Sequence, residues 1–315
     1  MQIANPIYDV VFKYLMEDSK IAKLMISSII GENIEELSFL PQEFISDIDK
    51  QPKQKTPLRK QRDSLTVYRL DFSAKIKTPE GLKHVIIELQ KAKFPTDIMR
   101  FRKYLGEQFS NKENFQKIKI GNRIRKTGLP IISIYFLGHK LDNTTSSAIK
   151  VSRQYSDLIT GKPIETRESF IESLTLDSYV IQIPYLTDKR RNELEILLSV
   201  FDQRNPADKE HHILNVKEED FPEKYRPIIR KLQKAVQDSE IKKKMELEDG
   251  IIDELEDMER EIEGLEQKVE AVVQENEHVK QENEQVKQEN EHVKQKNELL
   301  QLELEKLRKL LDNRE

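Results

Sequence analysis

The stretch TVYRLDFSAKIKTPEGLKHVIIELQ, residues 66–90, decides the fold of this chain. Apolar and polar residues alternate along 66–77 and again along 83–90, a pattern that predicts two half-buried strands. The TPEG segment between them, residues 78–81, suits a type I turn with proline at its second position and glycine at its fourth. We therefore expect a β-hairpin closed by this turn.

The hairpin is expected to place two acidic side chains opposite each other. Counting outward from the turn, Asp71 on the first strand faces Glu88 on the second, with Cβ atoms about 4.5 to 5.5 Å apart. Opposed like charges destabilise a hairpin unless something positive lies between them. Gln90 shares their face, and oxygen donors of this kind suit Mg²⁺ or Mn²⁺ rather than zinc. Such an ion could polarise a phosphodiester and activate water for in-line attack.

The remaining body of the chain alternates helical and strand patterns, which indicates an α/β domain. We expect one or two helices within 8–30 and further helices at 97–109, 188–201 and 222–236. The expected strands lie at 129–137 and 178–186. The run LPIISIYFL at 129–137 is apolar throughout, as expected for a central strand that is buried on both faces.

Four segments together resemble the PD-(D/E)XK nucleases, and within them the nuclease-family transposases related to recombination-promoting nucleases. They are NPIYDVVFKYLMED at 5–18, RLDFSAKI at 69–76, IIELQKAKFPTDIMRFRKYLGEQF at 86–109 and PIISIYFLG at 130–138. The likeness is clear over residues 4–140 and loose over 141–235. It implies a restriction-endonuclease-like core, a central mixed sheet flanked by helices, over residues 1–235.

The resemblance also implies a role for individual residues. Asp71 and Glu88 would bind the metal, with the carbonyl oxygen of Leu89 as a further ligand. Gln90 stands where the wider superfamily has a lysine that orients or activates the water, and glutamine is usual in this subfamily. Asp9 on the opening helix would be an auxiliary acidic residue. The catalytic set is therefore Asp71, Glu88, Gln90 and Asp9.

Basic side chains near these segments could bind the phosphates of a nucleic acid. The candidates are Lys91, Lys93, Arg100, Arg102 and Lys103. The last three begin the expected helix at 97–109, where they could equally form a solvated helix face.

Composition limits the classes of protein to which the chain can belong. Among its 315 residues 37% are hydrophobic, 35% are charged and none is cysteine. A disulfide-dependent scaffold, a thiolate zinc site and a cysteine nucleophile are therefore excluded. The sequence contains neither an apolar run of roughly 20 residues nor a signal-peptide pattern. We expect a soluble, cytoplasmic protein with no membrane partner.

The last part of the chain, residues 236–315, has a different design. From Gln274 the heptads QENEHVK, QENEQVK, QENEHVK and QKNELLQ repeat with asparagine at position a and valine or leucine at d, which predicts a coiled coil. Asparagines can bond their symmetry mates in a parallel pair, and Glu at g faces Lys at e of the partner helix. We expect a parallel homodimer; a solvated, partly helical tail is the alternative.

Two functions fit these patterns together with the resemblance, and the link to mobile elements is implied by the resemblance alone. The first is a Mg²⁺- or Mn²⁺-dependent DNA endonuclease of the mobile-element type, with low sequence specificity and two subunits joined by the coiled coil. The second is a catalytically inactive nuclease-fold protein that binds nucleic acid or serves as a coiled-coil assembly module.

Overall fold

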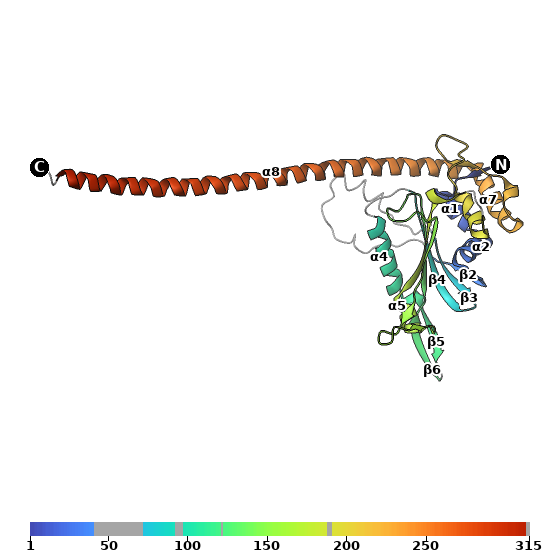
Figure 1. Ribbon diagram of the computed structural model, residues 1–315. Helices are drawn as coiled ribbons and strands as arrows, with labels where there is room; N and C mark the ends of the chain where they lie inside the picture. The colour runs from blue at the N-terminus through green and yellow to red at the C-terminus, as the bar shows by residue number, and fades with distance from the viewer. Residues whose placement is uncertain (41–71, 92–96, 121, 188–190, 313–315) are drawn as a thin grey trace, which may run out of the picture. The chain divides into compact units, whose positions relative to one another are not determined.

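The computed structural model describes residues 1–40, 72–91, 97–120, 122–187 and 191–312. The chain forms two compact units, Met1–Ile252 and Asp253–Glu315. The first unit is an α/β domain, and the second consists of the later part of one long helix (Figure 1). The expected α/β class and the long C-terminal helix are thereby confirmed.

The predicted opening helices, hairpin, helix and buried strand occur in the predicted order, but the unpredicted β5–β6 hairpin lies between that helix and the buried strand. The helices are α1 Asp9–Met16, α2 Ser19–Ile30, α4 Asp97–Ser110, α5 Ser169–Leu174, α6 Glu193–Leu198, α7 Arg226–Val236 and α8 Ser239–Asp312. The strands are β1 Gln2–Ala4, β2 Glu36–Phe39, β3 Phe72–Thr78, β4 Gly81–Gln90, β5 Phe115–Ile120, β6 Arg123–Gly128, β7 Ile131–Leu137, β8 Ala148–Val151, β9 Tyr155–Ser156, β10 Pro163–Ile164, β11 Leu176–Gln182 and β12 Ile213–Asn215.

The main sheet is mixed and has six strands in the order β2-β3-β4-β7-β11-β8. β3 pairs antiparallel with β2 and β4, whereas β4 and β11 each pair parallel with β7. A parallel pair needs a long connection, and the chain from β4 to β7 runs through α4 and the β5–β6 hairpin. β4 and β7 are thus the central strands.

The predicted hairpin is confirmed over its described length. Every described pair, from Phe72 opposite Ile87 to Thr78 opposite Gly81, has the register that the sequence predicts. Asp71 lies outside the described residues, so its pairing with Glu88 stays a prediction. One expectation was wrong: β4 is not half-buried, because all its residues from His84 to Leu89 are buried. Its second face is covered by α4, which alternation within the strand does not reveal.

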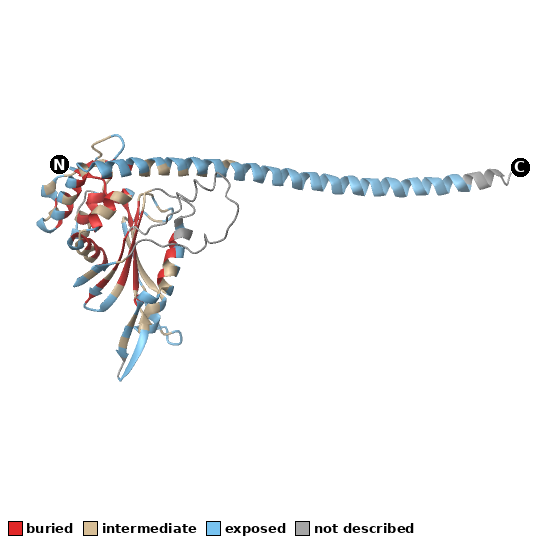
Figure 2. Cartoon of the chain, turned by 180° about the vertical axis from the view of Figure 1, so that it is seen from behind, coloured by how far each residue is buried: buried red, intermediate tan, exposed pale blue. Residues whose placement is uncertain are grey.

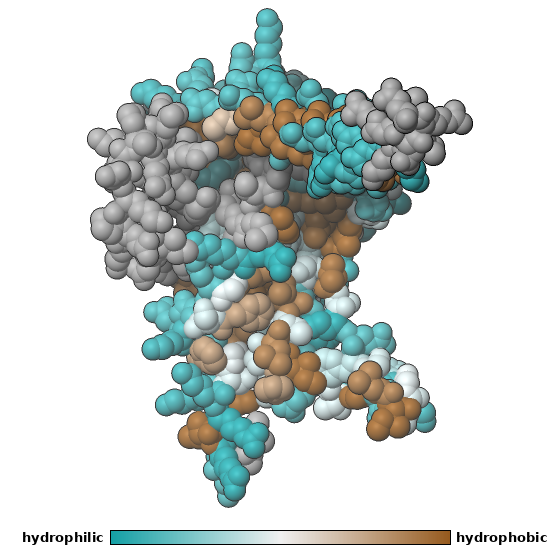
Figure 3. Space-filling view, turned by 90° about the vertical axis from the view of Figure 1, so that its left-hand side faces the viewer, coloured by the Kyte–Doolittle hydropathy of each residue, from teal (hydrophilic) through white to brown (hydrophobic). Residues whose placement is uncertain are grey.

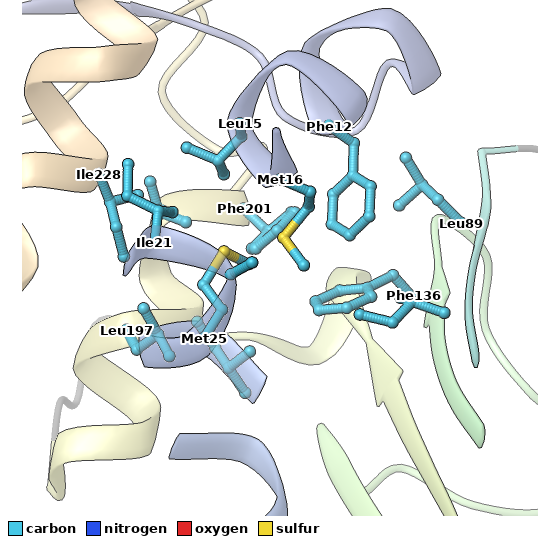
Figure 4. Close-up of a cluster of buried hydrophobic side chains, with 14 of the residues drawn as sticks. Phe12, Leu15, Met16, Ile21, Met25, Leu89, Phe136, Leu197, Phe201 and Ile228 are labelled. Carbon is cyan, nitrogen blue, oxygen red and sulfur yellow. The ribbon is translucent and has the colours of Figure 1, made fainter. Parts of the chain in front are cut away.

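The larger hydrophobic core lies on the face of the sheet that carries Leu89. Figure 4 shows Phe12 of α1 near Leu89 and Phe136, with Phe201 beside them. The rings of Phe136 and Phe201 are 4.7 Å apart between centroids, and those of Phe12 and Phe136 are 5.5 Å apart. A smaller core on the other face joins Ile86 of β4 to Phe101 of α4. Buried residues accordingly concentrate in the sheet and its covering helices (Figure 2).

The opening helices end where local sequence dictates. Asp18 caps α2, because its carboxylate accepts the backbone N–H groups of Lys20 and Ile21 at 2.9 and 3.3 Å. Gly31 ends α2 in the left-handed conformation, with φ of 76°. The pattern at 8–30 therefore forms two helices, one of the two outcomes it allows.

The first unit extends further along the chain than expected. The sequence places the boundary between residues 235 and 236, whereas the structure divides the chain after Ile252. The reason is that the first turns of α8 pack into the domain, where Ile241 and Met245 are 5% and 3% exposed. Within the described part of the chain, no helix combines the length and apolar character that membrane crossing requires.

Candidate active site

Glu88 is the one predicted metal-binding side chain that the structure describes. It lies near the carboxyl end of β4, pairs in register with Tyr135 of β7, and is 2% exposed. Burial raises the pKa of the Tyr135 hydroxyl above its ordinary value, and the nearby Glu88 carboxylate raises it further. A carboxylate in such a place is costly to bury unless hydrogen bonds or a cation balance its charge. This is the environment in which a strand carboxylate can hold a metal ion.

The other predicted ligands are described only in part. Asp71 lies outside the described residues. The Leu89 side chain points to the opposite face and packs in the larger core. Gln90 is partly exposed at the end of β4, and its backbone carbonyl oxygen accepts a hydrogen bond from the N–H of Gly138 at 2.7 Å. Gln90 is thus the last residue of β4, two residues after Glu88.

The predicted oxygen donors suit a hard cation, but only if Asp71, which is outside the described residues, is included with Glu88. The described residues by themselves contain no group of three or more His, Asp and Glu side chains arranged around a possible metal. Glu88 supplies carboxylate oxygens, and the confirmed hairpin register has Asp71 as its next expected partner. The predicted Mg²⁺ or Mn²⁺ site therefore depends on Asp71 together with Glu88.

His84 lies on the same face of β4 as Glu88 and is fully buried. Its Nε2 is 2.8 Å from the hydroxyl of Ser73. Burial, with a smaller contribution from Lys75, lowers the pKa of His84 to about 4. The imidazole is therefore neutral at physiological pH. From the sequence, His84 could be identified only as a histidine on the same face of the strand as Glu88.

Lys91, a predicted phosphate ligand, belongs to a polar cluster centred on Asp249. It forms an ion pair with Asp249, and its Nζ lies 3.5 Å from the centre of the Tyr8 ring. The Tyr8 hydroxyl donates to Asp249 at 3.0 Å, and Nε2 of His212 lies 2.6 Å from the same carboxylate. These contacts engage the partly exposed Lys91 side chain in an ion pair with Asp249, and its role as a phosphate ligand stays a prediction.

Asp9 lies beside this cluster. Its carboxylate pairs with Lys13 at 2.6 Å, and its backbone N–H donates to Glu248 at 3.0 Å. Among the described contacts, none joins Asp9 to Glu88. Sequence reasoning missed Glu248 and Asp249, because both fall in the segment that it assigned to the coiled coil.

The remaining predicted phosphate ligands come after β4 in the sequence. Arg102 and Lys103 are exposed on α4. Arg100 belongs to α4, but its side chain is outside the described part, as is the whole of Lys93. Two of the five candidates are thus available at the surface.

Glu248→Gln is expected to stabilise the first unit at pH 8. Burial, with smaller contributions from the neighbouring Asp9 and Asp249 carboxylates, raises the pKa of Glu248 to about 7. The folded state therefore retains a proton that the unfolded state releases, and stability falls as pH rises from 4.5 through 7. Because the side chain is only half-buried, we expect a gain of about 1–2 kcal/mol at pH 8 and little change at pH 4.5.

Urea unfolding followed by tyrosine fluorescence measures this difference, since the last tyrosine of the chain is Tyr225 and the signal reports the first unit alone. The matched control is Glu246→Gln, at an exposed position two residues earlier. Equal stability of wild type and Glu248→Gln at pH 8 would contradict the prediction.

Comparison of the chain with models of protein families, with curated proteins and with solved structures found no match.

Proposed function

We propose that this chain is a metal-dependent endonuclease that hydrolyses phosphodiester bonds in DNA, of the type associated with mobile elements and with low sequence specificity. The observation that carries the proposal is Glu88, a carboxylate that is 2% exposed in a central strand. The register of its hairpin has Asp71 as the next expected pair. The opening helix, hairpin, helix and buried strand also occur in the order of the four segments that carry the resemblance, which supports the proposal.

In this proposal each residue has a defined task. Asp71 and Glu88 hold Mg²⁺ or Mn²⁺, which would polarise the phosphoryl group and lower the pKa of a bound water. The Gln90 amide orients the attacking water by a hydrogen bond, although it cannot supply the positive charge of a lysine. Buried His84 stays neutral beside the site, because its pKa is about 4.

The test is cleavage of supercoiled plasmid by the full chain with Mg²⁺ or Mn²⁺, beside an Asp71→Ala/Glu88→Ala variant. Nicking by the wild type alone supports the proposal. Equal nicking by both proteins would place any activity elsewhere, and inactivity of a folded wild type would overturn it.

The alternative is a catalytically inactive nuclease fold that binds nucleic acid or assembles through its helix. Gln90 in the position of the superfamily lysine is the observation that favours it. Calorimetric titration with Mn²⁺ separates the two functions. A protein that has lost its chemistry has no need to retain a binding site for the ion.

We also propose that the second unit pairs with a second copy of itself as a parallel coiled coil. In the single chain the apolar side chains at its a and d positions are about half-exposed; Val279, Val286 and Val293, for example, are 45%, 53% and 54% exposed. A helix with an unburied apolar stripe gains stability when the stripe is covered. The glutamates at g and lysines at e complement each other in the parallel arrangement.

Replacing three d-position valines is expected to abolish this pairing. Sedimentation of Val279→Ser/Val286→Ser/Val293→Ser should give a monomer, because three apolar layers of the seam are lost. The matched control changes the f positions Gln281, Gln288 and Gln295 to serine and should stay dimeric. A monomeric wild type at micromolar concentration would contradict the proposal.

A further inference from the structure

The β5–β6 hairpin is a basic arm that sequence reasoning did not identify. Its fourteen residues, 115–128, contain five basic side chains and no acidic one: Lys117, Lys119, Arg123, Arg125 and Lys126. All five are exposed. The two strands form a separate sheet that pairs with no other described strand, and they extend from the end of the main sheet (Figure 1). At the corresponding, lower end of the molecule, Figure 3 shows hydrophilic side chains beside scattered hydrophobic ones.

The register of the arm gathers cations on both of its faces. Lys117 is directly opposite Lys126, and Lys119 shares their face. Arg123 and Arg125 lie on the other face. Directly opposed lysines destabilise a hairpin, and no described acidic side chain forms an ion pair with any of the five cations. The arm therefore carries unneutralised positive charge, as a surface that meets a polyanion would.

The base of the arm is held firmly. Asn114 is 4% exposed, and its amide donates to both oxygens of Gln108 in α4, at 3.0 and 2.8 Å. On the other strand, a Cβ at Gly128 would lie 3.2 Å from that of Ser173 in α5, so the two backbones approach closely. The arm is thus a fixed projection of the domain with charge along its free length.

We propose that the basic arm enters a groove of double-stranded DNA and anchors the substrate. A two-stranded ribbon fits the major groove, which is about 12 Å wide, and six residues per strand reach about 20 Å along it. Cations on both faces match a groove, because phosphate backbones lie on either side of it, whereas an acidic protein or a membrane surface meets one face only. The inference rests on the proposed function, because it is the proposed endonuclease activity that makes double-stranded DNA the substrate.

The binding experiment uses the full chain, a labelled 30-base-pair duplex and EDTA, so that cleavage does not interfere. Lys117→Gln/Lys119→Gln/Lys126→Gln is expected to weaken binding at least about tenfold at 100 mM salt and to lower the slope of log affinity against log salt by about 2 to 3. The control, Lys242→Gln/Lys243→Gln/Lys244→Gln, removes the same charge from exposed positions at the start of α8 and should bind nearly as wild type. Thermal unfolding verifies that both variants fold.

The outcomes separate this inference from the proposed function. Loss of duplex binding in the arm variant alone supports the arm. Equal binding by wild type and the arm variant overturns it, as does tighter binding of the wild type to a single strand than to the duplex. Plasmid nicking measured in parallel tests the endonuclease independently, since nicking that needs Glu88 but not the arm would retain the proposed function and discard the anchor.

Discussion

Glu88→Gln is expected to lower metal-dependent plasmid cleavage by at least about a thousandfold while leaving the fold intact. A metal ion contributes several kcal/mol of charge stabilisation in the transition state, and every 1.36 kcal/mol corresponds to a factor of ten in rate. Glutamine has nearly the shape of glutamate, so it fills the same space in β4. Its neutral amide removes the carboxylate that would hold the ion, and it lessens the cost of burying a charge at a position that is 2% exposed.

A second readout of this substitution does not depend on turnover. Mn²⁺ should raise the thermal midpoint of the wild type, because a ligand that binds only the folded state stabilises it, and it should leave the midpoint of Glu88→Gln unchanged. Glu165→Gln, at an exposed position of the same unit, is the control and should respond as wild type. An equal shift in the wild type and Glu88→Gln would show that the ion binds elsewhere.

The hairpin could be predicted because its determinants are local. The TPEG turn fixes the register, and alternation on both sides fixes which residues share a face, so the pairing of Phe72 with Ile87 follows from neighbouring residues alone. Burial of the second face of β4 could not be predicted in the same way. It depends on Phe101 of α4 packing on Ile86, a contact between elements.

The Asp249 cluster lies beyond sequence reasoning for the same reason. Lys91 and Asp249 are 158 positions apart, and nothing in the local pattern near either residue indicates its partner. Asp249 follows a run of charged residues that is typical of the beginning of a coiled coil. It belongs to the domain because Ile241 and Met245, earlier in the same helix, pack into the core.

The basic arm, by contrast, left a signal in the sequence. Residues 117–120, Lys-Ile-Lys-Ile, alternate charged with apolar side chains, and the Gly-Asn pair at 121–122 is a typical connection of a two-residue hairpin. A search of the sequence for buried apolar segments does not find the arm, because few side chains of the arm are buried. The alternation and the turn are local signals from which the element could have been predicted, and its uniform charge is a further signal that the sequence carries.

Gly138→Ala is expected to destabilise the first unit by about 3 kcal/mol or more, the largest stability effect that we predict. Gly138 follows β7, and its N–H donates to the carbonyl of Gln90 at 2.7 Å. An added Cβ would lie 2.3 Å from the carbonyl oxygen of Lys91 and 3.0 Å from its Cα. These are backbone atoms, so the clash can be relieved only if the end of β4 moves away from β7.

Such a movement reaches the candidate site, since Lys91 directly follows Gln90, the last residue of β4, and Glu88 lies two residues before Gln90. We therefore expect a lower urea midpoint by tyrosine fluorescence, together with weaker Mn²⁺ stabilisation of the protein that remains folded. Gly106→Ala is the control: it lies in α4 with no atom within 4 Å of the added Cβ, and alanine favours a helix by about 0.5–1 kcal/mol over glycine. If Gly138→Ala were as stable as Gly106→Ala, the backbones of β4 and of the residue after β7 would not approach as closely as the structure places them.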